Sequence, residues 1–269
     1  MGDVVVNIGN LALRFEILDR AFANMVRRRY AAFLDAPEAA LRGTFQVEPL
    51  PKRYTGDATS PAPDEELSVS CTDGSWSISR GDFRAEWRPA ERRGSVRLAR
   101  GIHGFDSLLR IVHSLELAQE GGFLLHSAGV IRNGRAFLFS GLSGSGKTTM
   151  TRLAPANTVL LSDEIAYVRP AEDTYIAWGT PFCGELGRSG ENVQAPIAGL
   201  YLLKHGAANQ LQPVPSGQAL GLLLRNILFF AQDADLVRAL FEAAWRFISV
   251  VPAYHLVFRP DPSVWELFP

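Results

Sequence analysis

The chain has few cysteines and no excess of basic residues. It contains only two cysteines, Cys71 and Cys183, which cannot form a disulfide framework. No paired spacing of Cys and His indicates a zinc site. Basic and acidic side chains nearly cancel, with 27 Lys and Arg against 28 Asp and Glu. This balance argues against binding through charge alone, so we expect no nucleic-acid partner.

Long hydrophobic runs are also lacking. The longest, at residues 219–231, is interrupted by Arg225 and is too short to span a bilayer. The first residues show no basic segment followed by an apolar core, so no signal peptide is predicted. Hydrophobic residues make up 47% of the 269 residues, which is typical of a globular protein with one or two domains. We therefore expect a cytoplasmic protein that does not associate with membranes.

The pattern of residues 1–120 indicates a smaller α+β domain. We expect this domain to help to recognise a substrate or partner. Apolar alternation between Val4 and Ile17 indicates one or two strands, and Asp19 is placed to cap the helix that follows. A second helix is expected at 106–120, where Gly121 and Gly122 end it and mark the domain boundary. The remaining features are an exposed loop at 55–66 and a hairpin turn at Asp73 and Gly74.

The clearest motif is a glycine-rich loop that begins at Gly141. Its pattern, G-x-x-x-x-G-K-[ST], is complete, with the apolar strand RAFLFS before it and a predicted helix after it. Glycines let successive backbone N–H groups turn inward and surround phosphate oxygens. The expected nucleotide-binding residues are Gly141, Ser143, Gly144, Ser145, Gly146, Lys147, Thr148 and Thr149.

Two residues of this loop have distinct predicted roles. The ammonium of Lys147 would attract the β- and γ-phosphates, and the hydroxyl of Thr148 would bind Mg²⁺. Lysine is informative at this position because the chain contains only three lysines and otherwise uses arginine. The structural alternative is a glycine-rich turn between strand and helix that binds no ligand.

The dipeptide Asn133-Gly134 predicts a tight hairpin between the runs FLLHSAGVI and RAFLFS. In such a hairpin the facing residues have numbers that sum to 267, which places His126 beside Gly141. His126 thereby becomes a candidate neighbour of the γ-phosphate or a proton-transfer partner. A histidine packed among apolar strand neighbours is the alternative. The strand that enters the loop would then have an antiparallel neighbour.

An acidic pair, Asp163 and Glu164, follows the short apolar strand predicted at 158–161. Phosphoryl transfer needs a carboxylate on the Mg²⁺ side and often a second one to accept the proton of the nucleophile. We expect this strand to lie next to the one that enters the loop. Because strand residues alternate between faces, only one of the two carboxylates should face the nucleotide unless the strand contains a bulge. A solvated acidic turn is the alternative.

The segments HSAGVIRNGRAFLFSGLSGSGKTT (126–149) and LLSDE (160–164) resemble the HPr kinase/phosphorylase family, whose fold is shared with phosphoenolpyruvate carboxykinases. The resemblance covers about residues 121–269. It implies an α/β fold in which a nucleotide-binding domain contains a mixed, partly antiparallel sheet. The residues that it carries over individually are His126, Lys147, Thr148 and Asp163.

The same resemblance implies roles for the acidic pair. Asp163 would be the catalytic proton acceptor, and Glu164 would help to hold the metal, although the family has Asp where this chain has Glu. It also implies a homo-oligomer. The long family segment that binds HPr has no clear counterpart in this chain.

Downstream, the glycine-rich segment at 179–188 contains Glu185 and Arg188. Glu185 is a candidate second metal ligand, and Arg188 is a candidate clamp for the substrate or transition state. A surface loop is an equal alternative for both. Helices predicted at 217–231 and 233–248 would cover the sheet, and a last strand is expected at 254–258.

Together these features predict a kinase that depends on ATP and Mg²⁺. Its acceptor would be a hydroxyl of a peptide, a protein or a small metabolite. Asp163, His126 and Lys147 are the expected catalytic residues, with the metal held by Thr148, Glu164 and Glu185. Two alternatives stay open: a nucleotide-binding regulatory or assembly module without catalysis, and a conventional ATPase. Parallel neighbours on both sides of the strand at 135–140 would favour the ATPase.

Overall fold

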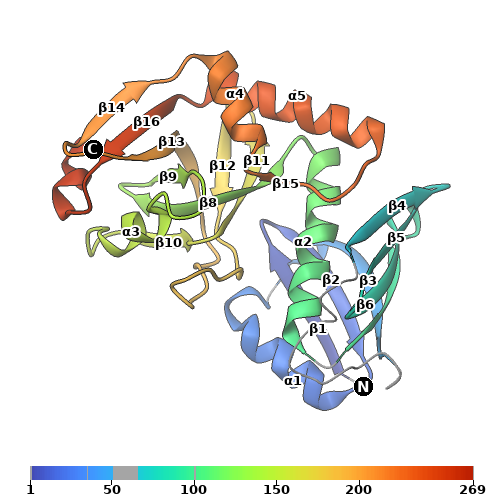
Figure 1. Cartoon of the computed structure of the whole chain (residues 1–269). Coiled ribbons are helices and arrows are strands. Elements are labelled where there is room, and N and C mark those ends of the chain that lie inside the picture. Colours follow the sequence, from blue (N-terminus) through green and yellow to red (C-terminus); the bar gives the residue numbers. More distant parts are fainter. Residues whose placement is uncertain (1, 35, 51–65, 100, 269) are drawn as a thin grey trace. The chain divides into compact units, whose positions relative to one another are not determined.

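The computed structural model describes residues 2–34, 36–50, 66–99 and 101–268. Except for Glu66, the loop predicted at 55–66 lies outside the described residues. The chain divides into two compact units, one of Met1–Leu115 with Phe230–Asp235 and one of Glu116–Phe229 with Leu236–Pro269 (Figure 1). Each unit is built on a mixed β-sheet, so the protein has the predicted mixed α/β composition.

The sheet of the first unit has seven strands in the order β1-β2-β3-β7-β6-β5-β4. The β2–β3 and β3–β7 pairs are parallel, and the other neighbours are antiparallel. One face is apolar and the other polar, because buried and exposed residues alternate along the central strands. The strands are β1 (Gly2–Ile8), β2 (Leu11–Ile17), β3 (Leu41–Pro49), β4 (Ser68–Thr72), β5 (Ser75–Arg80), β6 (Phe83–Arg88) and β7 (Arg93–Leu98).

Two helices, α1 (Arg20–Arg29) and α2 (Ile102–Gln119), pack on the apolar face. Phe105 of α2 is fully buried, with its ring centroid 4.6 Å from that of Phe15 in β2 and 6.0 Å from that of Phe22 in α1. These contacts join both helices to one core. Short 3₁₀ helices span Ala31–Phe33, Glu38–Ala40 and Pro89–Glu91.

Several predictions for this unit are confirmed. The carboxylate of Asp19 accepts the N–H groups of Ala21 and Phe22 at 2.8 and 3.2 Å, as an N-cap does. Asp73 and Gly74 form the turn between β4 and β5. The helix predicted at 106–120 begins earlier, because its buried face extends back to Phe105.

The second unit has a nine-stranded sheet with the order β10-β8-β11-β12-β13-β16-β14, while β9 pairs with β8 and β13, and β15 pairs with β8. The β9–β13 and β13–β16 pairs are parallel. The strands are β8 (Phe123–Arg132), β9 (Arg135–Ser140), β10 (Val159–Ser162), β11 (Ile165–Ala171), β12 (Thr174–Trp178), β13 (Gln194–His205), β14 (Gln210–Pro213), β15 (Ile227–Leu228) and β16 (Ala253–Phe258).

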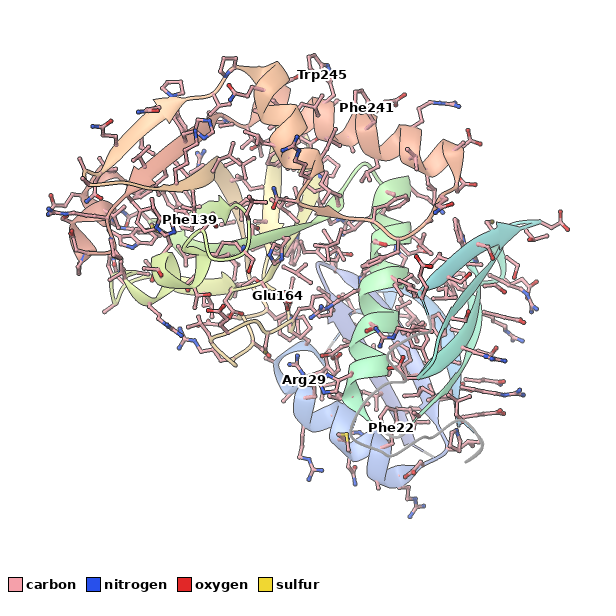
Figure 2. All side chains as sticks on the ribbon, in the orientation of Figure 1. Phe22, Arg29, Phe139, Glu164, Phe241 and Trp245 are labelled. Carbon is pink, nitrogen blue, oxygen red and sulfur yellow. The ribbon has the colours of Figure 1, made fainter. Side chains whose placement is uncertain are left out.

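Helices lie on both faces of this sheet. Side chains of α4 (Ser216–Leu224) and α5 (Ala234–Val250) pack with Leu138 of β9. The alternate residue, Phe139, faces the other layer, which includes α3 (Lys147–Arg152) and the 3₁₀ helix at Pro262–Leu267. Figure 2 shows Phe139 inside this unit. Successive side chains of β9 therefore point to opposite faces of the sheet and pack into two separate apolar cores.

The hairpin that enters the glycine-rich loop has the predicted register. Ser127 faces Ser140, and Arg132 faces Arg135. Asn133 and the following glycine both have the positive φ angles of a tight hairpin turn. A conventional ATPase would be favoured by parallel neighbours on both sides of β9. Instead, β9 lies between antiparallel β8 and parallel β13.

Two predictions for the second unit are wrong. The helix at 217–231 ends at Leu224, and Ile227 and Leu228 instead pair with β8 as β15, so their apolar side chains join the sheet. The strand predicted at 158–161, now β10, lies next to β8 and not next to β9. The long strand β8 separates it from the strand that enters the loop.

Candidate functional site

The site begins where β8 changes its neighbours. Up to His126 this strand pairs with β11 and β15, whereas from Ser127 onward it pairs with β9 and then β10. Consequently β9 ends at this level, at Ser140, and the glycine-rich loop leaves from there. The turn between β10 and β11 lies at the same level, because the Ser127 N–H donates to the carbonyl of Glu164 at 3.0 Å. Strand pairing thus brings the histidine, the loop and the acidic turn together.

The glycine-rich loop lies at the edge where the parallel strands β9, β13 and β16 end, which is where open α/β sheets bind ligands. Gly144 has φ 76° and Gly146 has φ 101°, values that favour glycine. A Cβ atom on Gly146 would also lie 2.6 Å from Cζ of Phe258, at the end of β16. The loop therefore packs closely on the sheet at Gly146, whereas no atom of the described residues lies within 4 Å of a Cβ atom built on Gly144.

Lys147 is the first residue of α3 and is 9% exposed. Its Nζ donates to the carbonyls of Gly141 at 2.9 Å and Leu142 at 3.3 Å, which leaves one of its three N–H groups for a ligand. Burial lowers the pKa of Lys147, and the charges of Glu185 and Glu164 oppose that shift. The two carboxylates are therefore close enough to act on this ammonium.

A cleft of about 290 Å³ lies in front of the loop. Its lining comes from β8, the loop with the start of α3, the acidic turn and the segment after β12. The structure therefore brings together all six residues predicted to be catalytic or to bind metal. The lining residues are His126, Ser143, Gly144, Gly146, Lys147, Thr148, Thr149, Asp163, Glu164, Gly184 and Glu185.

Asp163 is 3% exposed, and both of its carboxylate oxygens accept backbone hydrogen bonds. Gly184 donates to Oδ1 at 2.9 Å and Leu186 donates to Oδ2 at 2.7 Å. The carboxylate thus holds the backbone on both sides of Glu185. A carboxylate has about four lone-pair sites, so this one keeps capacity for a further donor.

The expectation that only one carboxylate faces the nucleotide applied to a regular strand, and β10 has a register shift between Leu160 and Ser162. Asp163 and Glu164 both line the cleft. Alternation fails because these residues form a turn instead of continuing the strand. The hydroxyl of Ser162 accepts the N–H groups of Glu164 at 3.0 Å and Ile165 at 2.7 Å, which shapes this turn. The serine before the acidic pair was the sequence signal for that turn.

Three predicted residues do not line the cleft. Gly141 and Ser145 lie in the loop behind it, and the buried hydroxyl of Ser145 has no hydrogen-bond partner among the described residues. Arg188 is exposed and lies outside the lining. The structure therefore does not bring Arg188 to the place where a clamp on a bound phosphate would act.

The donor set suits Mg²⁺ better than a metal held entirely by protein. In the described ranges, no three His, Cys, Asp or Glu side chains gather as a metal site. Mg²⁺ commonly binds one or two carboxylates and completes its shell with phosphate oxygens and water. Thr148, Glu164 and Glu185 line one cleft and match that chemistry.

Sequence reasoning missed the residues that act through the backbone. The sequence of the segment at 179–188 directs attention to its charged side chains, whereas its N–H groups at Gly184 and Leu186 make the contacts with Asp163. It also missed His205, whose Nε2 lies 2.9 Å from the carbonyl oxygen of Gly144. Neither contact leaves a periodic signal, because each joins residues distant in sequence.

Comparison with known proteins identifies the family. The family model described as "SynChlorMet cassette protein ScmC" matches residues 102–267, which is more than half of the chain. The chain belongs to this family. No curated protein matches it. Among solved structures, the Hpr(Ser) kinase/phosphatase from Coxiella burnetii aligns at 10% identity and a TM-score of 0.32, over 54% of this chain and 91% of that chain.

A helix that crosses a bilayer needs about 20 predominantly apolar residues. Among the described residues, no helix is both long enough and apolar enough to cross a membrane.

Proposed function

We propose that this ScmC-family chain is a phosphotransferase that uses ATP and Mg²⁺ and transfers the γ-phosphoryl group to a hydroxyl. The supporting observation is the composition of the cleft. One cleft contains an ammonium on a glycine-rich loop, a hydroxyl beside it, three carboxylates and a histidine. Phosphoryl transfer uses an ammonium, a hydroxyl and carboxylates of this kind, because catalysis rests on positioning the phosphates and neutralising their charge.

The proposal assigns distinct roles to the glycine-rich loop and to the three carboxylates. Loop N–H groups and Lys147 bind the phosphates, and Thr148, Glu164 and Glu185 hold Mg²⁺, which would neutralise phosphate charge when bound. The acceptor oxygen forms a bond to the γ-phosphorus as the bond to the β-phosphate oxygen breaks, and ADP leaves. The hydroxyl proton passes to Asp163, which its two backbone N–H donors hold in a fixed orientation.

Binding is tested first, by calorimetric titration of Mg²⁺-ATP. We expect the wild type to bind and Lys147→Ala to bind at least about tenfold more weakly, since a charged hydrogen bond contributes about 1.5–3 kcal/mol. Lys204→Ala is the matched control, because this exposed lysine lies on β13 outside the cleft lining. Absence of binding by the wild type, or equal loss in both variants, would contradict the proposal.

Transfer is tested with γ-labelled ATP against peptides that contain Ser, Thr or Tyr and a panel of small alcohols. Asp163→Asn keeps one oxygen for a backbone donor but cannot accept a proton. We expect it to retain Mg²⁺-ATP binding and to lose at least about a hundredfold in transfer rate. Unchanged transfer at neutral pH would rule out Asp163 as the base.

The alternative is a nucleotide-binding module without catalysis. It draws on the same contacts, because a carboxylate whose two oxygens already hold a loop could serve the fold alone. It predicts Mg²⁺-ATP binding, no transfer to any acceptor and no ADP formation. The transfer experiment therefore separates the two functions.

A further inference from the structure

His205 is the last residue of β13 and lies outside the cleft lining. Its register partner is Phe258, the last residue of β16. Three residues earlier, Leu202 pairs with Ser140, the last residue of β9. Both β13 and β16 therefore extend past the end of β9, beside the glycine-rich loop.

His205 contacts both the loop and the end of β16. Its Nε2 lies 2.9 Å from the carbonyl oxygen of Gly144, and its ring stacks on Phe258 with centroids 5.9 Å apart and an interplanar angle of 28°. Phe258 is 1% exposed and closely approaches Gly146. The loop thus rests on an aromatic pair that contacts it at two glycines.

We infer that His205 is a positioning residue for the phosphates of the nucleotide. A carbonyl oxygen can only accept, so Nε2 carries the proton and donates it to Gly144. Gly144 lines the cleft, and tying down its carbonyl fixes the peptide planes whose N–H groups would face a phosphate. This inference rests on the proposed function but concerns a residue outside the cleft lining.

The test uses two variants that distinguish the hydrogen bond from Nε2 of His205 from the stacking of its ring. His205→Phe keeps an aromatic ring for stacking on Phe258 and removes the N–H donor. His205→Gln removes the ring and keeps an N–H donor of similar reach. We expect His205→Phe to weaken binding of Mg²⁺-ATP about five- to tenfold, and His205→Gln to stay within about twofold of the wild type.

Inorganic triphosphate with Mg²⁺ is the second probe, because the effect should follow the phosphates and not the base. We expect the same loss in His205→Phe with triphosphate. In transfer assays KM for ATP should rise while kcat stays unchanged, since loop order affects binding before chemistry. Equal affinity of His205→Phe and the wild type would overturn the inference.

Hydrogen exchange without nucleotide makes the test independent of the proposed function. We expect amides 144–147 to exchange faster in His205→Phe than in the wild type. In His205→Gln their exchange rates should return to those of the wild type. Failure of the wild type to bind any nucleotide would overturn the proposed function and the role of His205 in binding. Unchanged exchange in His205→Phe would overturn the ordering of the loop, whatever the binding result.

Discussion

The backbone N–H of Gly184 donates to Oδ1 of Asp163 at 2.9 Å, and this contact joins the segment after β12 to the acidic turn between β10 and β11. Together with the Leu186 contact, it fixes the backbone on either side of Glu185. One buried carboxylate therefore sets the place of another that lines the same cleft.

Removing that carboxylate should release the segment. In Asp163→Ala the N–H groups of Gly184 and Leu186 lose their acceptors, and loss of such hydrogen bonds costs about 1–3 kcal/mol. We expect these two amides to exchange about 10- to 100-fold faster, measured by hydrogen exchange without nucleotide. Glu164→Gln is the control and should leave their exchange unchanged, because these bonds end on Asp163. Equal exchange in Asp163→Ala and the wild type would contradict this role.

The two loop glycines should differ in their tolerance of a methyl group. Gly146→Ala meets a positive φ and the buried ring of Phe258, and we expect it to destabilise the fold by about 2–4 kcal/mol. Gly144→Ala meets only the positive φ, with no atom within 4 Å of its Cβ, and should cost about 1 kcal/mol. Thermal unfolding of both variants without nucleotide measures the difference. Equal melting temperatures would show that Phe258 yields to the added methyl group.

Some of this site could be predicted from the sequence, because short-range chemistry determines it. Asn133 and Gly134 specify a turn type, a turn type specifies a register, and the register places His126 beside the loop. The loop motif is likewise contiguous, so its position between β9 and α3 followed from its neighbours.

The rest depends on contacts that leave no local pattern. Gly184 is 21 residues from Asp163, and only tertiary packing brings its N–H to that carboxylate. The prediction that residues 227–228 belong to a helix is wrong for another reason. A short apolar run is compatible with helix and strand alike. There the tertiary partner, β8, decides the outcome.

The cover of the sheet by α5 gives a stability prediction with an internal control. Phe247 is fully buried, with its ring centroid 5.3 Å from that of Phe123 and 5.1 Å from that of Tyr175. Phe247→Ala should destabilise the fold by about 3–5 kcal/mol, because it leaves a cavity between helix and sheet. Phe241 lies on the outer side of the same helix (Figure 2). It is 50% exposed, and Phe241→Ala should cost less than about 1 kcal/mol. Denaturant unfolding measures both, and equal losses would contradict this packing.

The lowered pKa of Lys147 predicts how nucleotide affinity depends on pH. Burial disfavours its charged form, so Lys147 loses its proton at a lower pH than an ordinary lysine does. Phosphates attract the ammonium and not the neutral amine. The Kd for Mg²⁺-ATP should therefore be flat near neutral pH and rise once the pH passes the lowered pKa, by at most about tenfold per pH unit. Titration calorimetry from about pH 7.5 to pH 10 measures this curve. Lys147→Met should bind weakly and show no such rise, whereas parallel curves for both proteins would assign the pH dependence to another group.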